Sequence, residues 1–465
     1  MPVLPIDTGR YGTPEMVRVF DEENRLRAML LVEGALALAQ AEVGEIPRED
    51  AERIWHIASS GLVRLEHVNA IEAEIRHATM AVVRALAEAC GPSGRYVHLG
   101  ATSSDILDTA LALQLKEALD ILEKRLCRLI ALLASLAERH KDLVMIGRTH
   151  GQHALPITLG FKFSVWVAEA YRHLQRLRDC RPRVLVGKMS GAVGTMAGLG
   201  PRAFEVQALV MEKLGLRPAE ISTQIVQRDR LAELICLLAI LASSLDNMAT
   251  EIRELQRTEI AELAEPFDER AQVGSSTMPH KKNPVICERI CGLAKIVRGL
   301  VVPALENVPT WHERDLTQSS AERFIVPEAL ILTDYMLFLM IRVLSGLRVN
   351  EERIKRNLYL TRGLIMSEAL MLELARRGLA RDEAYRLVRA LALKAIQEDR
   401  PFYEVARSEE AITSVIEPEE LKELLRPERY IGMAIEQVKR IVEMVSEDPD
   451  VRAIMDELAG RSQGA

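Results

Sequence analysis

One short segment gathers hydroxyl, imidazole and ammonium groups: GSSTMPHKKNP, from Gly274 to Pro284. Its glycine and two prolines are unfavourable inside a helix, so a loop is predicted here, between long helical patterns. In suitable surroundings a serine hydroxyl can remove a proton from carbon, and a lysine ammonium can stabilise the negative charge that results. The same composition also fits a solvated surface loop, and composition alone leaves both interpretations open.

Three further segments carry groups of chemical interest. Gly147–Gly160, GRTHGQHALPITLG, contains His150, and histidine changes its charge near neutral pH. Trp311–Arg323, WHERDLTQSSAER, contains arginines, whose planar guanidinium groups bind phosphate oxygens in a two-pronged geometry. Tyr96–Asp108, YVHLGATSSDILD, contains hydroxyl and carboxyl side chains of the kind that cap a helix. We take these segments, together with the loop, as the candidate functional segments.

Long helices are predicted between these segments. Leucines from Leu115 to Leu136, and again apolar residues from Leu231 to Leu255, recur three or four positions apart. Each run forms one narrow apolar stripe, and the heptad-like spacing predicts near-parallel packing, as in a helix bundle. A third apolar helix is predicted over Val326–Leu347, with its start signalled by Pro327. Because aromatic residues make up only 4% of the chain, a fold built mainly of sheet is disfavoured. The predicted fold class is all-α.

Glycine and proline divide the chain between these helices. Breaks are predicted at Gly91–Gly94, Gly147–Pro156, Gly187–Pro201 and Pro266–Pro284. The length of 465 residues corresponds to about three domains at roughly 150 residues each. We expect three helical domains, with these bounds: an N-terminal helical domain over 1–106, a central long-helix bundle carrying the Gly274–Pro284 loop over 107–346, and a C-terminal helical domain over 347–465.

Charge and hydropathy exclude several classes of partner. The net charge of −7 gives no general attraction to nucleic acid or to anionic membranes. The most apolar stretch, Ala329–Leu344, contains Asp334 and Arg342 and is too short to span a bilayer. Most of the six cysteines lie singly in apolar helical patterns, which is typical of reduced thiols. We expect a cytoplasmic protein that binds neither nucleic acid nor membranes.

The loop is similar to GSSxMPxKxNP, the signature of the fumarase/aspartase superfamily, whose members release fumarate by β-elimination. Gly147–Gly160 and Tyr96–Asp108 resemble two conserved regions of its adenylosuccinate lyase family, and Trp311–Arg323 resembles that family's nucleotide-end segment. Arg10-Tyr11 also matches. The resemblance implies cleavage of adenylosuccinate to AMP and fumarate, and of the succinylated aminoimidazole carboxamide ribotide. It implies no metal or organic cofactor, and succinylated nucleotides as the small-molecule partners.

The resemblance assigns the base and the anion-stabilising groups to the loop. Ser275 matches the base that removes the proton beside a carboxylate, and Ser276 is its main competitor, because sequence alone does not rank the two hydroxyls. Lys281 and Asn283 match the residues that hold the substrate carboxylates. Loop backbone N–H groups and Lys281 are the expected sources of the field that favours the alkoxide.

The acid is assigned to a histidine far away in the sequence. His150 matches the general acid that protonates the leaving purine nitrogen, and Glu288 matches the carboxylate that orients it. His77 matches a second active-site histidine, which anchors the phosphate and assists the acid. Many relatives have Asp after this histidine, whereas this chain has Ala78, so any role of that carboxylate must be absent or supplied elsewhere.

The resemblance also implies a set of substrate-binding residues and an assembly. The binding positions, besides Asn283, are Arg10, Tyr11, Thr102, Ser103, Thr149, Gln224, Arg289, Arg314, Ser319 and Arg323. In the family, the central helices of four chains form a core bundle, and each active site draws on three chains. A homotetramer with active sites shared between subunits is therefore expected, and the two apolar stripes offer more surface than one chain need bury.

Two other functions stay open at this point. Another fumarate-releasing lyase of the superfamily, such as argininosuccinate lyase, would share the loop. A non-catalytic helical assembly protein that kept the fold would not need the chemical groups. The presence of Ser275, Lys281, Asn283, His150 and Glu288 argues against the second alternative, and Ala78 is the one noted departure that favours it.

Overall fold

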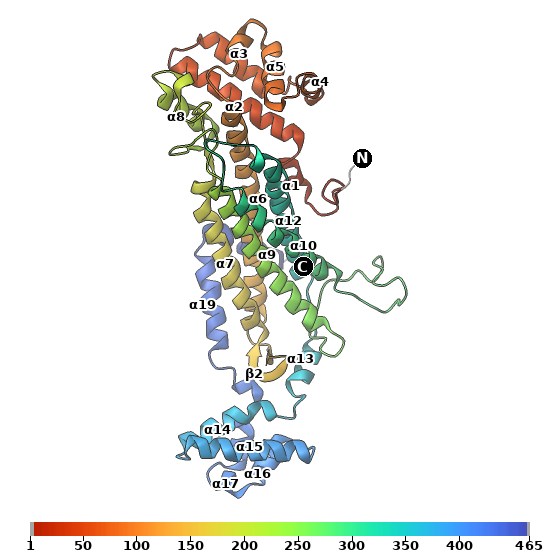
Figure 1. The fold of residues 1–465 in the computed structure, drawn as a ribbon. Helices are drawn as coiled ribbons and strands as arrows, with labels where there is room; N and C mark the ends of the chain where they lie inside the picture. Colours follow the sequence, from red (N-terminus) through yellow and green to blue (C-terminus); the bar gives the residue numbers. More distant parts are fainter. Residues whose placement is uncertain (1–3, 463–465) are drawn as a thin grey trace. The chain divides into compact units, whose positions relative to one another are not determined.

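The chain is predominantly helical in a computed structural model that describes residues 4–462 (Figure 1). It divides into two compact units. The first comprises Met1–Leu126, Arg172–Asp246 and Ile290–Leu339, and the second comprises Cys127–Tyr171, Asn247–Arg289 and Met340–Ala465. Five helices, α6, α7, α9, α10 and α12, have residues in both units. The domain bounds expected at 106/107 and 346/347 stay a prediction.

The longest connection between the described elements is the loop before α10. The α-helices are α1 (Pro14–Val19), α2 (Glu22–Glu42), α3 (Arg48–Ser59), α4 (Leu65–Ile75), α5 (Ala78–Cys90), α6 (Ser103–Arg139), α7 (Leu159–Val184), α8 (Ala203–Leu214), α9 (Asp229–Gln256), α10 (Val285–Gly299), α11 (Val301–Glu306), α12 (Thr317–Ser345), α13 (Glu351–Leu358), α14 (Ser367–Arg376), α15 (Arg381–Gln397), α16 (Phe402–Arg407), α17 (Glu410–Thr413), α18 (Pro418–Leu424), α19 (Ala434–Ser446) and α20 (Pro449–Ser462). The 3₁₀ turns are η1 (Gly91–Tyr96), η2 (Ala197–Leu199), η3 (Leu364–Met366) and η4 (Pro427–Arg429), and the strands are β1 (Val144–Thr149), β2 (Gln152–Thr158), β3 (Val186–Gly187), β4 (Arg217–Pro218), β5 (Leu263–Ala264) and β6 (Arg348–Val349).

The predicted long helices are confirmed, with one correction. The two leucine-rich stripes lie on α6 and α9, which contain 37 and 28 residues. The expected start of the third helix at Pro327 is wrong, because α12 begins ten residues earlier and Pro327 lies inside it. The physical reason is a cap: the Asp315 carboxylate accepts a hydrogen bond of 2.7 Å from the Thr317 backbone N–H, which satisfies a free donor of the first turn.

The N-terminal part of the first unit packs around α2. This helix is apolar on nearly all sides from Leu26 to Ala39, which is typical of a helix surrounded by others. It packs against α3 and α8, and Figure 1 shows α3 and α5 next to it. At its start the Asp21 carboxylate accepts from the Asn24 backbone N–H at 2.6 Å. The core formed in this way also includes Ile106, close to the beginning of α6.

The second unit has a separate core and most of the sheet. Its C-terminal helices α14, α15 and α16 pack together (Figure 1), with Leu370 and Phe402 fully buried. Ile146 of β1 belongs to the same core. β1 and β2 form an antiparallel hairpin that pairs Val144 with Thr158 at one end and Thr149 with Gln152 at the other. Two residues of β2 oppose Gly147, which produces a bulge.

The fold class is confirmed as helical, and the strands are local additions to it. The other two pairs join two residues each: β3 with β4 in parallel, and β5 with β6 in antiparallel orientation. The break predicted at Gly147–Pro156 therefore lies within a hairpin, a long-range pairing that helical periodicity does not reveal.

Two helices, α9 and α12, are long and apolar enough to cross a membrane by length and composition alone. In both, most of the apolar window is buried inside the chain, 61% in α9 and 67% in α12. A helix whose apolar surface is already covered by protein is typical of the core of a soluble protein.

Candidate active site

The tip of the β1–β2 hairpin presents the predicted acid. His150 and Gly151 form a two-residue turn, and both have positive φ, 54° and 72°. This backbone geometry matches the type I′ turn that suits a tight hairpin, and for a residue other than glycine it is uncommon. Thr149 and His150 are both exposed at this tip. The imidazole is therefore held outward by a turn whose shape is fixed by the flanking strands.

A second histidine of the hairpin has different surroundings. His153 pairs with Arg148 across the two strands and is half-buried. Burial lowers the pKa of its imidazole, and the positive charge of Arg148 lowers it further. The charged form that a proton donor needs is therefore disfavoured at His153. Of the two histidines in this segment, His150 is the better acid candidate.

The Gly274–Pro284 loop is closed at its neck. A side chain at Gly274 would lie 2.2 Å from the Lys281 carbonyl oxygen, so this position requires glycine. The Asn283 side-chain amide donates to the Gly274 carbonyl at 2.9 Å. These contacts bring the two ends of the loop together. Ser275 therefore follows directly after one end, and Lys281 and Asn283 lie at the other end beside it. The loop predicted over Pro266–Pro284 is confirmed as irregular apart from turns.

The two serines of the loop differ in their contacts. The Ser275 Oγ accepts hydrogen bonds from the backbone N–H groups of Thr277, at 3.3 Å, and of Met278, at 3.1 Å. The Ser276 hydroxyl contacts only the neighbouring Thr277 hydroxyl among the described residues, at 3.5 Å. Donors aimed at an oxygen favour its anionic form, and the same bonds also stabilise the turn. These contacts favour Ser275 over Ser276 as the base.

Glu288 lies in the first turn of α10, directly after the loop, and Arg289 follows it. The buried Glu265 carboxylate accepts from the backbone N–H groups of Ile286 and Cys287, at 3.1 and 3.0 Å, and so caps this helix. Glu288 itself is exposed. The buried Glu265 side chain thus fixes the start of α10, which directly follows the loop and carries Glu288.

In the first unit a cavity of about 200 Å³ collects three predicted binding residues, Arg314, Ser319 and Arg323. Its wall also includes residues from α2, from the first turns of α6 and from the connection before α9, among them Asp108 and Arg228. Gln224 joins this set through its side-chain oxygen, which accepts from the Arg314 guanidinium at 3.0 Å. The structure therefore brings four of the predicted substrate-binding residues together.

Charge in this cavity is unevenly matched. Arg228 is buried and pairs with both Asp108 and Glu322, at 2.8 and 2.7 Å, so its charge is neutralised locally. Within residues 4–460, neither Arg314 nor Arg323 forms an ion pair with a carboxylate. Burial raises the pKa of Glu322, and the nearby arginines oppose that rise. The arrangement leaves two guanidinium groups available to an anion such as a phosphate.

One residue of the cavity, Gln318, was not predicted from the sequence as a binding residue. Gln318 is only 1% exposed, and both polar atoms of its amide have no hydrogen-bond partner among the described side chains and backbone. The Nε of Arg314, in the same cavity, is also buried without a partner. Neither feature has a signal in the sequence, because both depend on which residues surround the side chain.

The other predicted residues of the first unit lie outside the lining of this cavity. His77 caps the start of α5, where its Nδ1 accepts from the Met80 backbone N–H at 3.2 Å. Because Nδ1 accepts this hydrogen bond, the proton of the imidazole lies on Nε2. Arg10 is exposed, and the Tyr11 ring lies 6.2 Å from the Tyr335 ring. Thr102 and Ser103 stand at the start of α6.

The structure thus combines a helical fold, a loop with hydroxyl and ammonium groups, and a cavity lined by guanidinium groups. Comparison with known families shows the class of protein, because the family model described as Lyase matches residues 9–299. The chain is a lyase of the fumarase/aspartase superfamily. A second model, described as Adenylosuccinate lyase C-terminus, matches residues 363–441. The chain is also 56% identical to an adenylosuccinate lyase of Pyrococcus horikoshii, over 96% of this chain and 99% of that one. It belongs to the adenylosuccinate lyase family.

Solved structures share the fold at lower identity. A fumarate lyase from Mesorhizobium sp. BNC1 aligns with a TM-score of 0.87 at 33% identity, over 93% of this chain and 98% of that one. The 3-carboxy-cis,cis-muconate lactonizing enzyme from Pseudomonas putida has the same TM-score at 35% identity, over 97% of this chain and 100% of that one. Because proteins with different names share this fold, the fold alone does not select a substrate.

Proposed function

We propose that this lyase cleaves adenylosuccinate to AMP and fumarate, and that it cleaves the succinylated aminoimidazole carboxamide ribotide in the same way. The observation that carries the proposal is the 56% identity to an adenylosuccinate lyase over nearly the full length of both chains. The cavity with Arg314 and Arg323 supports it, because both substrates carry a phosphate that needs such partners.

In the proposed reaction Ser275 acts as the base. Its oxygen takes the proton from the substrate carbon beside a carboxylate, which leaves a carbanion stabilised as a dianion on that carboxylate. Lys281 and Asn283, on the other side of the loop neck, hold the dianion through an ammonium and an amide. The two backbone N–H groups that Ser275 accepts from support this role, because they lower the cost of the alkoxide.

The bond between carbon and nitrogen then breaks, and His150 supplies the second proton. Electrons from the carbanion form the carbon–carbon double bond of fumarate, and the leaving nitrogen takes the proton of the His150 imidazolium. Glu288 orients that imidazole and stabilises its charge. His77 donates from Nε2 to the phosphate, a role that its capping contact at Nδ1 supports without an aspartate at position 78.

The remaining predicted residues hold the substrate in place. Arg314, Ser319 and Arg323 bind the phosphate and ribose side from the cavity, with Gln224 held by Arg314. The other members of the proposed binding set are Arg10, Tyr11, Thr102, Ser103, Thr149 and Arg289.

The test is fumarate release by the purified full-length chain. Adenylosuccinate, the succinylated aminoimidazole carboxamide ribotide and argininosuccinate are each mixed with the protein, fumarate is followed by absorbance, and AMP by chromatography. Equal amounts of fumarate and AMP from adenylosuccinate are expected. No AMP, with fumarate released from argininosuccinate, would identify another lyase of the superfamily. The Ser275→Ala variant, prepared identically, measures any contaminating activity.

We infer that the chain forms a homotetramer in the cytoplasm, with active sites shared between subunits. Large apolar side chains are exposed on three helices within the first unit, Ile240 on α9, Ile296 on α10 and Phe324 on α12, and exposed apolar side chains of this kind support burial against further copies. Sedimentation analysis should give four times the chain mass of 52.0 kDa. A monomer at working concentration would contradict the assembly.

A further inference from the structure

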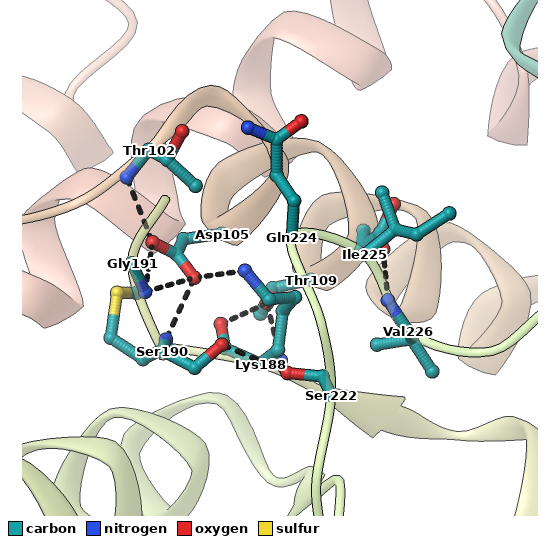
Figure 2. Close-up of polar contacts among 12 residues, drawn as sticks. Thr102, Asp105, Thr109, Lys188, Ser190, Gly191, Ser222, Gln224, Ile225 and Val226 are labelled. Atoms are coloured by element: carbon teal, nitrogen blue, oxygen red, sulfur yellow. Dashed lines mark hydrogen bonds and ion pairs between the residues drawn. The ribbon is translucent and has the colours of Figure 1, made fainter. Parts of the chain in front are cut away.

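A buried ion pair joins the start of α6 to the glycine-rich segment after β3. The Lys188 ammonium donates to the Asp105 carboxylate at 2.5 Å, and both side chains are fully buried (Figure 2). Lysine is among the residues least often buried completely, so its presence here calls for a reason. The sequence interpretation placed Lys188 in a loop and gave it no role.

The carboxylate holds backbone groups as well as the ammonium. Asp105 accepts from the backbone N–H groups of Ser190, at 2.8 Å, and of Gly191, at 3.1 Å. Its second oxygen also accepts from the Thr102 N–H at 2.8 Å, which closes the first turn of α6 like a capping box. Figure 2 shows these contacts converging on Asp105 from two separate segments. The Asp105 side chain therefore fixes the start of α6 against the segment that follows β3; we call this contact the α6 junction.

Further hydrogen bonds hold the Lys188 backbone and connect the α6 junction to Ser222. The Thr109 hydroxyl, one helical turn after Asp105, accepts from the Lys188 N–H and donates to its carbonyl, both at 3.0 Å. The Ser190 hydroxyl bonds the Ser222 hydroxyl at 2.8 Å (Figure 2). Gln224 lies two residues after Ser222, and its amide oxygen accepts a hydrogen bond from Arg314. A continuous set of contacts thus runs from Asp105 to a residue of the cavity.

We propose that Asp105 and Lys188 are positioning residues of the active site. They fix Thr102 and Ser103, at the start of α6, relative to the segment that carries Gln224, so that these three predicted substrate-binding residues keep one spacing. This inference rests on the proposed function for the ligand that the wall receives. A buried ion pair is a weak source of stability, because an apolar pair of similar size often does as well, so a geometric role better accounts for it.

The experiment separates geometry from stability by a double substitution. Asp105→Asn leaves a buried ammonium without its counter-charge, and Lys188→Met leaves the carboxylate with backbone donors only, so each should lower the urea midpoint of unfolding. In the double variant neither charge remains, and the midpoint should return towards the original value. The KM for adenylosuccinate should nevertheless stay raised by about tenfold, because the carboxylate that held the Thr102, Ser190 and Gly191 amides is gone.

Hydrogen exchange measures the same geometry without activity. Peptides covering 102–105 and 188–191 should exchange faster in the double variant, whether or not adenylosuccinate is the substrate. Unchanged exchange, or a KM that recovers together with the midpoint, would overturn the proposal. An unaltered protein that releases no fumarate from adenylosuccinate would instead contradict the proposed function.

Two further variants complete the test. Glu123→Gln removes a half-buried carboxylate of the same helix, which accepts from Arg178 at 2.6 Å, and should lower the midpoint without changing KM. Ser190→Ala cuts only the bond to Ser222 and leaves the ion pair intact, so it decides the matter if the double variant does not fold. We expect KM to rise by about threefold in Ser190→Ala, and no change there would overturn the link to Gln224.

Discussion

Arg148 and Glu262 form a two-pronged ion pair, with the guanidinium nitrogens 3.0 and 2.6 Å from the carboxylate oxygens. The Glu262 side chain is completely buried, and it also accepts from the Asn357 amide at 2.8 Å. Arg148 stands two residues before His150 on β1. The pair therefore anchors the strand whose tip carries the proposed acid, with a geometry that a single hydrogen bond would not define.

Glu262→Gln should damage both stability and turnover. It leaves Arg148 without its buried counter-charge, so the free energy of unfolding should fall by about 3 kcal/mol. Because the hairpin tip loses its anchor, kcat should fall by about tenfold with little change in KM. Urea unfolding and steady-state kinetics on the same preparation measure the two effects. Glu259→Gln, at an exposed position, is the control. A destabilised but folded variant with unchanged kcat would contradict the anchoring role.

Ser275→Ala should lower kcat by roughly a thousandfold, because it removes the proposed base while the binding groups remain. Ser276→Ala is the matched control and should retain most of its turnover, since its hydroxyl lacks the two backbone donors. Calorimetric titration with adenylosuccinate should show that the Ser275→Ala variant still binds. If the alanine at position 275 left turnover near that of the unaltered chain, Ser276 would become the preferred base.

Shared active sites can be tested by mixing inactive chains. The Ser275→Ala and His150→Ala proteins should each be inactive, and exchange of subunits within the proposed homotetramer should create some sites with both groups intact. We expect partial recovery of activity after mild dissociation and reassociation. Subunit exchange is verified by mass-tagged chains. Full exchange without recovered activity would indicate that both groups of each site come from one chain.

The helices could be predicted because their signal is local. The stripes on α6 and α9 follow from leucine spacing alone, and the Gly274–Pro284 loop follows from residues that a helix excludes. The β1–β2 hairpin and the true start of α12 could not be predicted in this way. The hairpin depends on pairing Val144 with Thr158, and the helix start depends on a cap at Asp315 that outweighs a proline further along.

The site shows the same division. Ser275, Lys281 and Asn283 lie close in sequence, so their grouping follows from the loop, and their assigned roles stay predictions. Gln318 and the Asp105–Lys188 pair could not be found from sequence, because burial and the identity of a partner 83 positions away are properties of the folded chain. The type of a residue limits the chemistry of its side chain, but its burial and its partners are set by the folded chain.

A half-buried histidine, His98, should give the stability a specific pH dependence. His98 Nδ1 lies 2.7 Å from the Glu33 carboxylate. Burial lowers the pKa of His98, but the hydrogen bond and charge of Glu33 outweigh it, so the folded pKa is raised. The resulting stability is fully present below the ordinary histidine pKa and is lost as pH rises through the raised value. The free energy of unfolding should therefore fall as the solution passes from mildly acidic to mildly alkaline.

Urea unfolding from about pH 5.5 to 8.5 measures this dependence. Glu33→Gln should flatten the fall in stability across that window. Glu88→Gln removes a similar partner from exposed His67 and should leave the slope unchanged, because solvent screens that pair. Parallel curves for the Glu33→Gln variant and the unaltered chain would contradict the assignment.

Gln318 should trade stability for binding. Its amide is buried in the cavity without a protein partner among the described residues, a state that costs about 1–3 kcal/mol when nothing satisfies it. Gln318→Leu keeps a similar volume and removes that cost, so the free energy of unfolding should stay equal or rise by about 1 kcal/mol. If the amide bonds the substrate, KM for adenylosuccinate should rise by about tenfold at the same time. Ser320→Ala, at an exposed position of the same helix, should change neither quantity. A variant that loses stability but keeps its KM would contradict this prediction, because the lost hydrogen bonds would then have been made within the protein and none of them to the substrate.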